Sequence, residues 1–180
     1  MSSANSSQWK VVIADRISGF PEVEQRIFGK QAQVVALNAK RIEELLGRIE
    51  DADAVLAWHD LQWNESLLAR LKNCKVIVRV GAGYDNVDLV SAKQRGIVVC
   101  NVPDYGTHDV ADHTMSLLLA LARGLFPFNR KTTEGEKSWA WEGVPTFRLT
   151  GKKVGVIGLG LIGNANSSSA KAYGMDVCFY

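Results

Sequence analysis

Residues 152–163 read KKVGVIGLGLIG, a short apolar run that leads into three glycines spaced G-x-G-x-x-G. The apolar run is typical of a buried parallel strand. In such a fingerprint Gly158 allows the tight turn, Gly160 lets the backbone approach a pyrophosphate, and Gly163 lets the next helix pack against its strand. The stretch therefore predicts a dinucleotide site at the start of a helix.

The sequence after the fingerprint has the order that a nucleotide-binding unit requires. Residues 165–173 can form the helix, Gly174 stands where a helix C-cap belongs, and residues 175–180 can form a second strand. The acidic residue that holds the ribose would follow Tyr180, so we expect an incomplete unit whose sequence does not choose NAD over NADP. The alternative is an ordinary strand–turn–helix without a ligand.

Composition excludes several classes of protein. The 180 residues are 47% apolar and 22% charged with a net charge of +2, and the charges are interspersed, which argues against a nucleic-acid partner. Cys74, Cys100 and Cys178 lie in or beside apolar runs without metal-ligand spacing, so we expect reduced core thiols of an intracellular protein and no metal. Residues 1–9 are expected to be a disordered tail, and no apolar stretch is long enough to span a membrane.

Upstream of the fingerprint, short apolar runs alternate with segments of helical spacing. This alternation predicts a parallel sheet with helices on both faces, in a unit that ends near Pro103. The predicted strands are 11–14, 34–37, 54–58, 76–80 and 97–100, and the predicted helices are 21–28, 42–49, 65–71 (with Asn64 as N-cap) and 87–95.

A long apolar helix is predicted over residues 110–123, and the segment 124–147 is predicted to be irregular. That segment carries many large aromatic side chains, which are costly to leave in water. They either contact another subunit or cover the core of the adjoining domain: Phe126, Phe128, Trp139, Trp141 and Phe147.

Four motifs occur in an order and spacing that resemble one family. They are RVGAGYDNVD at 79–88, GIVVCNVP at 96–103, VADHT at 110–114, and the glycine fingerprint. Together they resemble the D-isomer-specific 2-hydroxyacid dehydrogenases over nearly the whole chain, and most of all the branch that includes the C-terminal-binding-protein co-repressors.

The resemblance implies an α/β fold of two parts. Residues 10–108 would form the N-terminal part of a flavodoxin-like, parallel-sheet substrate domain. Residues 109–180 would form a hinge helix, a dimer arm and the first βαβ unit of a Rossmann NAD-binding domain, left truncated. The implied partners are a small 2-keto or 2-hydroxy acid, NAD or NADP, and a second subunit, in the cytoplasm.

The resemblance also implies site residues. Arg79, Ala82 and Gly83 would bind the substrate, since small residues at a strand-to-helix turn expose N–H groups to an anion; a plain glycine turn with Arg79 in a surface ion pair is the alternative. The residues implied for cofactor binding are Gly158, Gly160, Leu161, Ile162, Gly163 and Thr114.

No catalytic residue is assigned in this chain. Hydride transfer to a keto acid needs a proton donor, a cation for the carboxylate, and a carboxylate that tunes the donor. The family places its His, Arg and Glu for these roles well beyond the fingerprint. His59 and His108 follow apolar strands without an evident carboxylate partner, and His113 lies within the predicted long helix as an expected structural residue.

The helix after the fingerprint departs from the family pattern, because residues 164–169 are rich in Asn and Ser. Such residues compete for backbone hydrogen bonds within a helix, and Asn166 occupies a position that is usually apolar. A buried unsatisfied amide there costs about 1–3 kcal/mol. We therefore expect a nucleotide unit of reduced stability.

Three functions remain open. The first is an NAD(P)-dependent 2-hydroxyacid dehydrogenase, with this truncated chain inactive alone. The second is a co-repressor-like, dinucleotide-sensing module that binds short peptides and would also occur in the nucleus. The third is a nonfunctional truncation that exposes sheet edges and aggregates.

Overall fold

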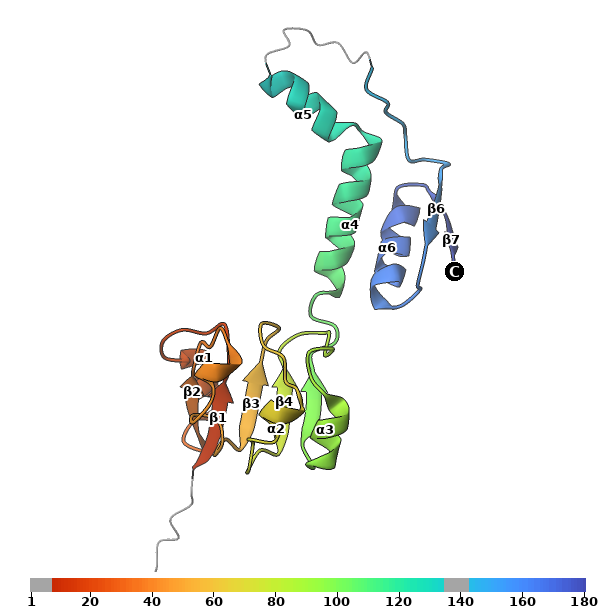
Figure 1. The fold of residues 1–180 in the computed structure, drawn as a ribbon. Helices are drawn as coiled ribbons and strands as arrows, with labels where there is room; N and C mark the ends of the chain where they lie inside the picture. The colour runs from red at the N-terminus through yellow and green to blue at the C-terminus, as the bar shows by residue number, and fades with distance from the viewer. Residues whose placement is uncertain (1–7, 135–142) are drawn as a thin grey trace, which may run out of the picture. The chain divides into compact units, whose positions relative to one another are not determined.

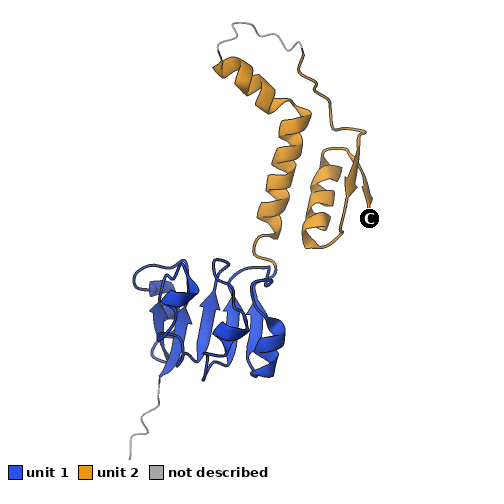
Figure 2. Cartoon of the chain, viewed as in Figure 1, with its two compact units in different colours: residues 1–103 blue, residues 104–180 orange. Residues whose placement is uncertain are grey.

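The computed structural model describes residues 8–134 and 143–180, and these form two compact units, 1–103 and 104–180 (Figure 2). Trp139 and Trp141, two members of the predicted aromatic arm, lie outside the described residues. The subunit contact predicted for that arm therefore stays a prediction.

Unit 1 is built on a five-stranded parallel sheet (Figure 1). The strand order is β2-β1-β3-β4-β5, which confirms the predicted parallel α/β class. β1 begins at Trp9, so the strand includes a residue assigned above to the tail. The strands are β1 (Trp9–Ile13), β2 (Ala32–Ala36), β3 (Ala54–Ala57), β4 (Val76–Arg79) and β5 (Val98–Asn101).

Helices cover both faces of this sheet, as the alternation predicted. Alternate residues of β1 enter different cores, because successive side chains of a strand point to opposite faces. Val12 packs into the larger core with α2 (Glu65–Leu68) and α3 (Leu89–Gln94), whereas Ile13 packs on the face of α1 (Glu22–Phe28). Asn64 caps α2 as predicted, since its side chain accepts a hydrogen bond from the Leu67 N–H.

The predicted helix over residues 42–49 is wrong. Only a short 3-10 turn, η1 (Ile42–Glu44), forms there, and Gly47 has a φ of +78°, which ends any right-handed helical path. Leu45 and Ile49 are nevertheless fully buried in the larger core. The apolar spacing therefore predicted the burial of these side chains correctly, but it did not predict the backbone conformation.

Unit 2 begins with α4 (Thr107–Ala122), and α6 (Leu161–Ala172) packs against it. The other elements are α5 (Leu125–Thr133), β6 (Lys153–Val156) and β7 (Asp176–Phe179), which pairs with β6 in parallel. The core joins Met115 and Ala122 of α4 to Ala170 of α6.

Helix α5 corrects the prediction that residues 124–147 are irregular throughout. Gly124, with a φ of +64°, lies between α4 and α5, so the two helices are separate elements. Pro127 lies in the first turn of α5. Backbone N–H groups in the first turn have no intrahelical acceptor, so the missing N–H of proline costs no helix hydrogen bond.

The expectation for the three cysteines is correct for one of them. Cys74 is buried, and burial raises the pKa of its thiol to about 11. Cys100 and Cys178 are exposed. Each lies on a strand, β5 or β7, at a position where no described residue covers that face of the strand. In the described part of the chain, no helix is long and apolar enough to cross a membrane.

Candidate functional site

Arg79, the last residue of β4, is a half-buried cation without a counterion among the described residues. Its Nη1 donates to the carbonyl of the adjacent Val80 at 3.2 Å, and its buried Nε has no hydrogen-bond partner. The guanidinium lies against Gly81, where a Cβ would displace it. Since buried charges are normally paired, this arrangement favours binding of an anion at the end of β4.

The loop after β4 is held by hydrogen bonds from the neighbouring strand. Asn101, at the end of β5, donates its side-chain amide to the carbonyl of Ala82 at 2.8 Å, and the Val102 N–H donates to the carbonyl of Gly81 at 3.1 Å. Ala82 and Gly83 are exposed. The structure thus places both predicted residues on the surface of the loop that follows Arg79.

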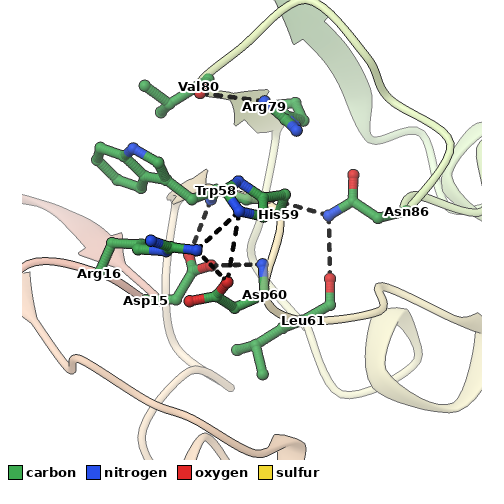
Figure 3. A network of polar contacts seen from close by, with 9 residues as sticks. All are labelled: Asp15, Arg16, Trp58, His59, Asp60, Leu61, Arg79, Val80 and Asn86. Atoms are coloured by element: carbon green, nitrogen blue, oxygen red, sulfur yellow. Dashed lines mark hydrogen bonds and ion pairs between the residues drawn. The ribbon is translucent and has the colours of Figure 1, made fainter. Parts of the chain in front are cut away.

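A second group of polar residues lies at the carboxyl ends of β1 and β3 (Figure 3). Asp15 is fully buried, and its carboxylate accepts hydrogen bonds from the N–H groups of Trp58 at 2.8 Å and Asp60 at 3.2 Å. Asn86 donates from its side-chain amide to the carbonyls of Trp58 and Leu61, both at 3.0 Å. These bonds fix the loop after β3 from both sides.

Three partly exposed side chains meet on that loop. Arg16 Nη2 donates to Asp60 Oδ1 at 2.6 Å and lies 2.7 Å from His59 Nε2. The hydrogen bond with Asp60 is the main cause that raises the pKa of Arg16, and the same bond lowers the pKa of Asp60. His59 Nε2 is 3.6 Å from Asp60 Oδ1, a distance longer than a hydrogen bond.

This cluster was not predicted from the sequence, in which no carboxylate partner of His59 is evident. The available signal was the position of two polar pairs, Asp15-Arg16 after β1 and His59-Asp60 after β3. Neighbouring parallel strands end at the same edge of a sheet, so residues that follow them meet.

The glycine fingerprint forms the turn between β6 and α6 in unit 2. Gly158 has a φ of +86°, a conformation that L side chains rarely adopt. A Cβ at Gly163 would overlap the carbonyl oxygen of Gly158, so glycine is required where the helix approaches the turn. A Cβ at Gly160 would meet no atom within 4 Å, which leaves space for a ligand.

The first turn of α6 has N–H groups available to an anion. Gly160 is the N-cap and provides no side-chain hydrogen bond, and Leu161 and Ile162 are exposed at the first helical positions. The N-terminus of a 12-residue helix carries partial positive charge and unpaired donors. The residues present therefore fit the pyrophosphate of a dinucleotide.

Thr114 and two of the three histidines lie on α4. Thr114 is exposed on α4, and its hydroxyl donates to the carbonyl of Val110 at 2.7 Å. His108 and His113 are exposed on the same helix, so His113 is not a core residue. Within residues 8–134 and 143–180, no three His, Cys, Asp or Glu side chains form a possible metal site.

The chain matches the family model of the D-isomer specific 2-hydroxyacid dehydrogenase catalytic domain over residues 11–178. The chain belongs to this family. It is 34% identical over 171 residues to D-3-phosphoglycerate dehydrogenase of Methanocaldococcus jannaschii, covering 95% of this chain and 32% of the relative. It is 32% identical over 164 residues to C-terminal-binding protein 1 of Caenorhabditis elegans, covering 88% of this chain and 23% of the relative.

Solved structures agree with this fold. The TT0316 protein of Thermus thermophilus superposes with a TM-score of 0.81 at 32% identity, over 94% of this chain and 55% of that one. D-lactate dehydrogenase of Aquifex aeolicus, complexed with NAD and lactic acid, superposes with a TM-score of 0.79 at 24% identity, over 94% and 50%. The chain thus spans about half the length of these structures and a third or less of the two curated relatives.

Similarity alone does not separate the dehydrogenase relative from the C-terminal-binding protein. The enzyme relative and the C-terminal-binding protein differ by two percentage points in identity, 34% against 32%. The choice between these functions rests on the site.

Proposed function

We propose that this protein is an NAD(P)-dependent oxidoreductase that acts on the CH–OH group of small 2-hydroxy acids. Within this proposal, Arg79, Ala82 and Gly83 bind the acid, and the turn from Gly158 to Gly163 together with Thr114 binds the dinucleotide. Arg79 carries the proposal, because it is a half-buried guanidinium without a counterion among the described residues.

A carboxylate is the anion that suits Arg79. A guanidinium presents paired N–H donors that match the two oxygens of a carboxylate, and hydrogen bonds between charged groups are roughly twice as strong as neutral ones. The exposed backbone of Ala82 and Gly83 lies in the loop that follows. An acid bound here would supply the partner that the buried Nε lacks.

The dinucleotide supplies the hydride when it is bound. The fingerprint residues would hold its pyrophosphate through backbone N–H groups at the start of α6, next to the open space at Gly160. The Aquifex aeolicus relative, described in complex with NAD and lactic acid, supports this type of ligand pair. NAD and NADP remain equal candidates.

The proton donor is not assigned to a histidine of this chain. His59 is the one of the three histidines with an ionic neighbour among the described residues, but its Nε2 lies 2.7 Å from Arg16 Nη2 and 3.6 Å from Asp60 Oδ1, too far for a hydrogen bond with that carboxylate. We therefore propose that the 180 residues alone bind ligands without turning them over, and that the family's activity requires further residues and a homodimer.

The test is calorimetric titration of the purified chain with NADH and then with oxamate, a non-reactive analogue of a 2-oxo acid. We expect micromolar binding of NADH. Arg79→Gln should weaken oxamate binding about tenfold or more, since a hydrogen bond to a charged group contributes about 1.5–3 kcal/mol. Arg95→Gln, which removes the same charge from a surface pair with Glu65, should bind oxamate normally.

Two results would contradict the proposal. Unchanged oxamate affinity in Arg79→Gln would remove Arg79 from the acid site. Measurable oxidation of NADH by the isolated chain with glyoxylate, pyruvate or hydroxypyruvate would show that the chain holds its own proton donor.

A further inference from the structure

The cluster of Arg16, His59 and Asp60 is more constrained than an ordinary surface ion pair. Arg16 has a φ of +69°, a left-handed conformation that is uncommon for residues other than glycine. The preceding residue, Asp15, is fully buried and bonded to the backbone of the loop that carries His59. The backbone therefore directs the Arg16 side chain to this loop at some cost in local conformational energy.

The contact with Arg16 determines which nitrogen of His59 carries the proton. A guanidinium has donors and no acceptor, so the Nε2 atom at 2.7 Å must accept. A neutral imidazole whose Nε2 accepts carries its hydrogen on Nδ1. Among the described residues Nδ1 has no partner, and the His59 side chain is 57% exposed, so its N–H donor is available to a ligand.

His59 follows β3, and Arg79 ends the neighbouring strand β4 at the same edge of the sheet. Ala57, two residues before His59, pairs in register with Arg79, and adjacent strands lie about 4.8 Å apart. Asn86, in the loop that follows Arg79, donates to the carbonyls of Trp58 and Leu61 on either side of His59. The same close-up contains the His59 cluster and Arg79 (Figure 3).

We propose that Arg16 and Asp60 are positioning residues that hold His59 as its Nδ1–H tautomer, and that His59 donates this hydrogen bond to an oxygen of the acid bound on Arg79. The inference rests on the proposed function, because the acid must first occupy Arg79. Through this hydrogen bond His59 would select acids that have an acceptor oxygen beside the carboxylate. His59 acts here by binding, and no proton transfer is assigned to it.

The first measurement is the tautomer of His59 in the 180-residue chain, read from long-range proton–nitrogen spectra with 15N-labelled histidine. We expect His59 in the Nδ1–H form, with its signal assigned by its loss in His59→Phe. Arg16→Gln should convert that signal to the mixture of tautomers typical of an exposed histidine. Arg41→Gln, which breaks a different exposed ion pair on the same unit, should leave it unchanged.

The second measurement is oxamate affinity in the same variants. His59→Phe should weaken binding about fivefold, the loss of one neutral hydrogen bond of about 1 kcal/mol. His59→Gln keeps an N–H donor and should bind within about twofold of the unaltered chain. Arg16→Gln should weaken oxamate binding severalfold, with a melting temperature that shows the chain still folded.

Each failure has a separate meaning. If His59→Phe binds oxamate normally while Arg79→Gln does not, the inference is wrong and the proposed function stands. If Arg16→Gln leaves the tautomer unchanged, Arg16 is not a positioning residue. If the unaltered chain shows no oxamate binding, both the inference and the acid site on Arg79 are overturned.

Discussion

At the scale of single residues, two glycines of the fingerprint are required for different physical reasons. Gly163 is needed by the fold, because a Cβ there would overlap the Gly158 carbonyl oxygen. Gly160 has ordinary backbone dihedrals and open space around it, so the fold itself does not exclude a side chain. The lack of a side chain at Gly160 instead allows a ligand to approach the backbone.

This difference predicts that the same substitution affects stability at one glycine and only ligand binding at the other. Gly163→Ala should lower the melting temperature of the chain and weaken NADH binding as a consequence. Gly160→Ala should leave the melting temperature unchanged and weaken NADH binding by about tenfold or more, because the new methyl group fills the space for the pyrophosphate. Calorimetry and NADH titration of the two variants measure both quantities. Normal NADH binding by folded Gly160→Ala would argue for a turn without a ligand.

At the scale of elements, α6 forms in spite of its unfavourable composition. The hydroxyls of Ser167 and Ser168 donate to the carbonyls of Gly163 and Asn164, four residues earlier. These side chains therefore form their hydrogen bonds within the helix. Asn166 does not, since its buried Oδ1 has no partner. The unsatisfied amide expected from the sequence is therefore present in the structure.

Asn166→Ala should accordingly stabilise the chain. The substitution removes a buried unsatisfied oxygen and adds helix propensity, so we expect the free energy of unfolding to rise by about 1–2 kcal/mol. Ser168→Ala in the same helix is the control, and it should gain about 0.5 kcal/mol or less because its exposed hydroxyl is already bonded. Urea denaturation measures the difference. Equal gains in the two variants would show that the Asn166 amide costs nothing.

At the scale of the whole molecule, the chain has separate hydrophobic cores for its two units. The larger core of unit 1 contains Ile77, which is fully buried, and the core of unit 2 contains Met115, which is 7% exposed. Each core is formed by elements of its own unit. Units with their own cores can unfold as separate cooperative transitions.

We therefore expect two transitions in scanning calorimetry of the chain. Ile77→Ala should lower one of them, by a loss of about 2–5 kcal/mol from the cavity it creates. Met115→Ala should lower the other and leave the first in place. NADH, if it binds the fingerprint, should raise the transition that Met115→Ala lowers. A single transition shifted by both substitutions would show that the units unfold together.

The sequence by itself determined the parallel α/β class, the family, and the turn at Gly158. These depend on hydrophobic periodicity and glycine spacing, which act over a few residues. Local spacing failed at residues 42–49, where buried Leu45 and Ile49 lie on turns around a left-handed Gly47, and at α5, which forms within a segment predicted to be irregular.

The tertiary structure alone decided the surroundings of Arg79 and the cluster of Arg16, His59 and Asp60. Arg16 and His59 are 43 residues apart in the chain, and they meet because β2 lies outside β1, which leaves β1 beside β3. Whether Arg79 has a counterion likewise depends on which carboxylates the fold brings near it. The spacing of residues along the chain contains no such information, because strand order is set by packing across the whole sheet.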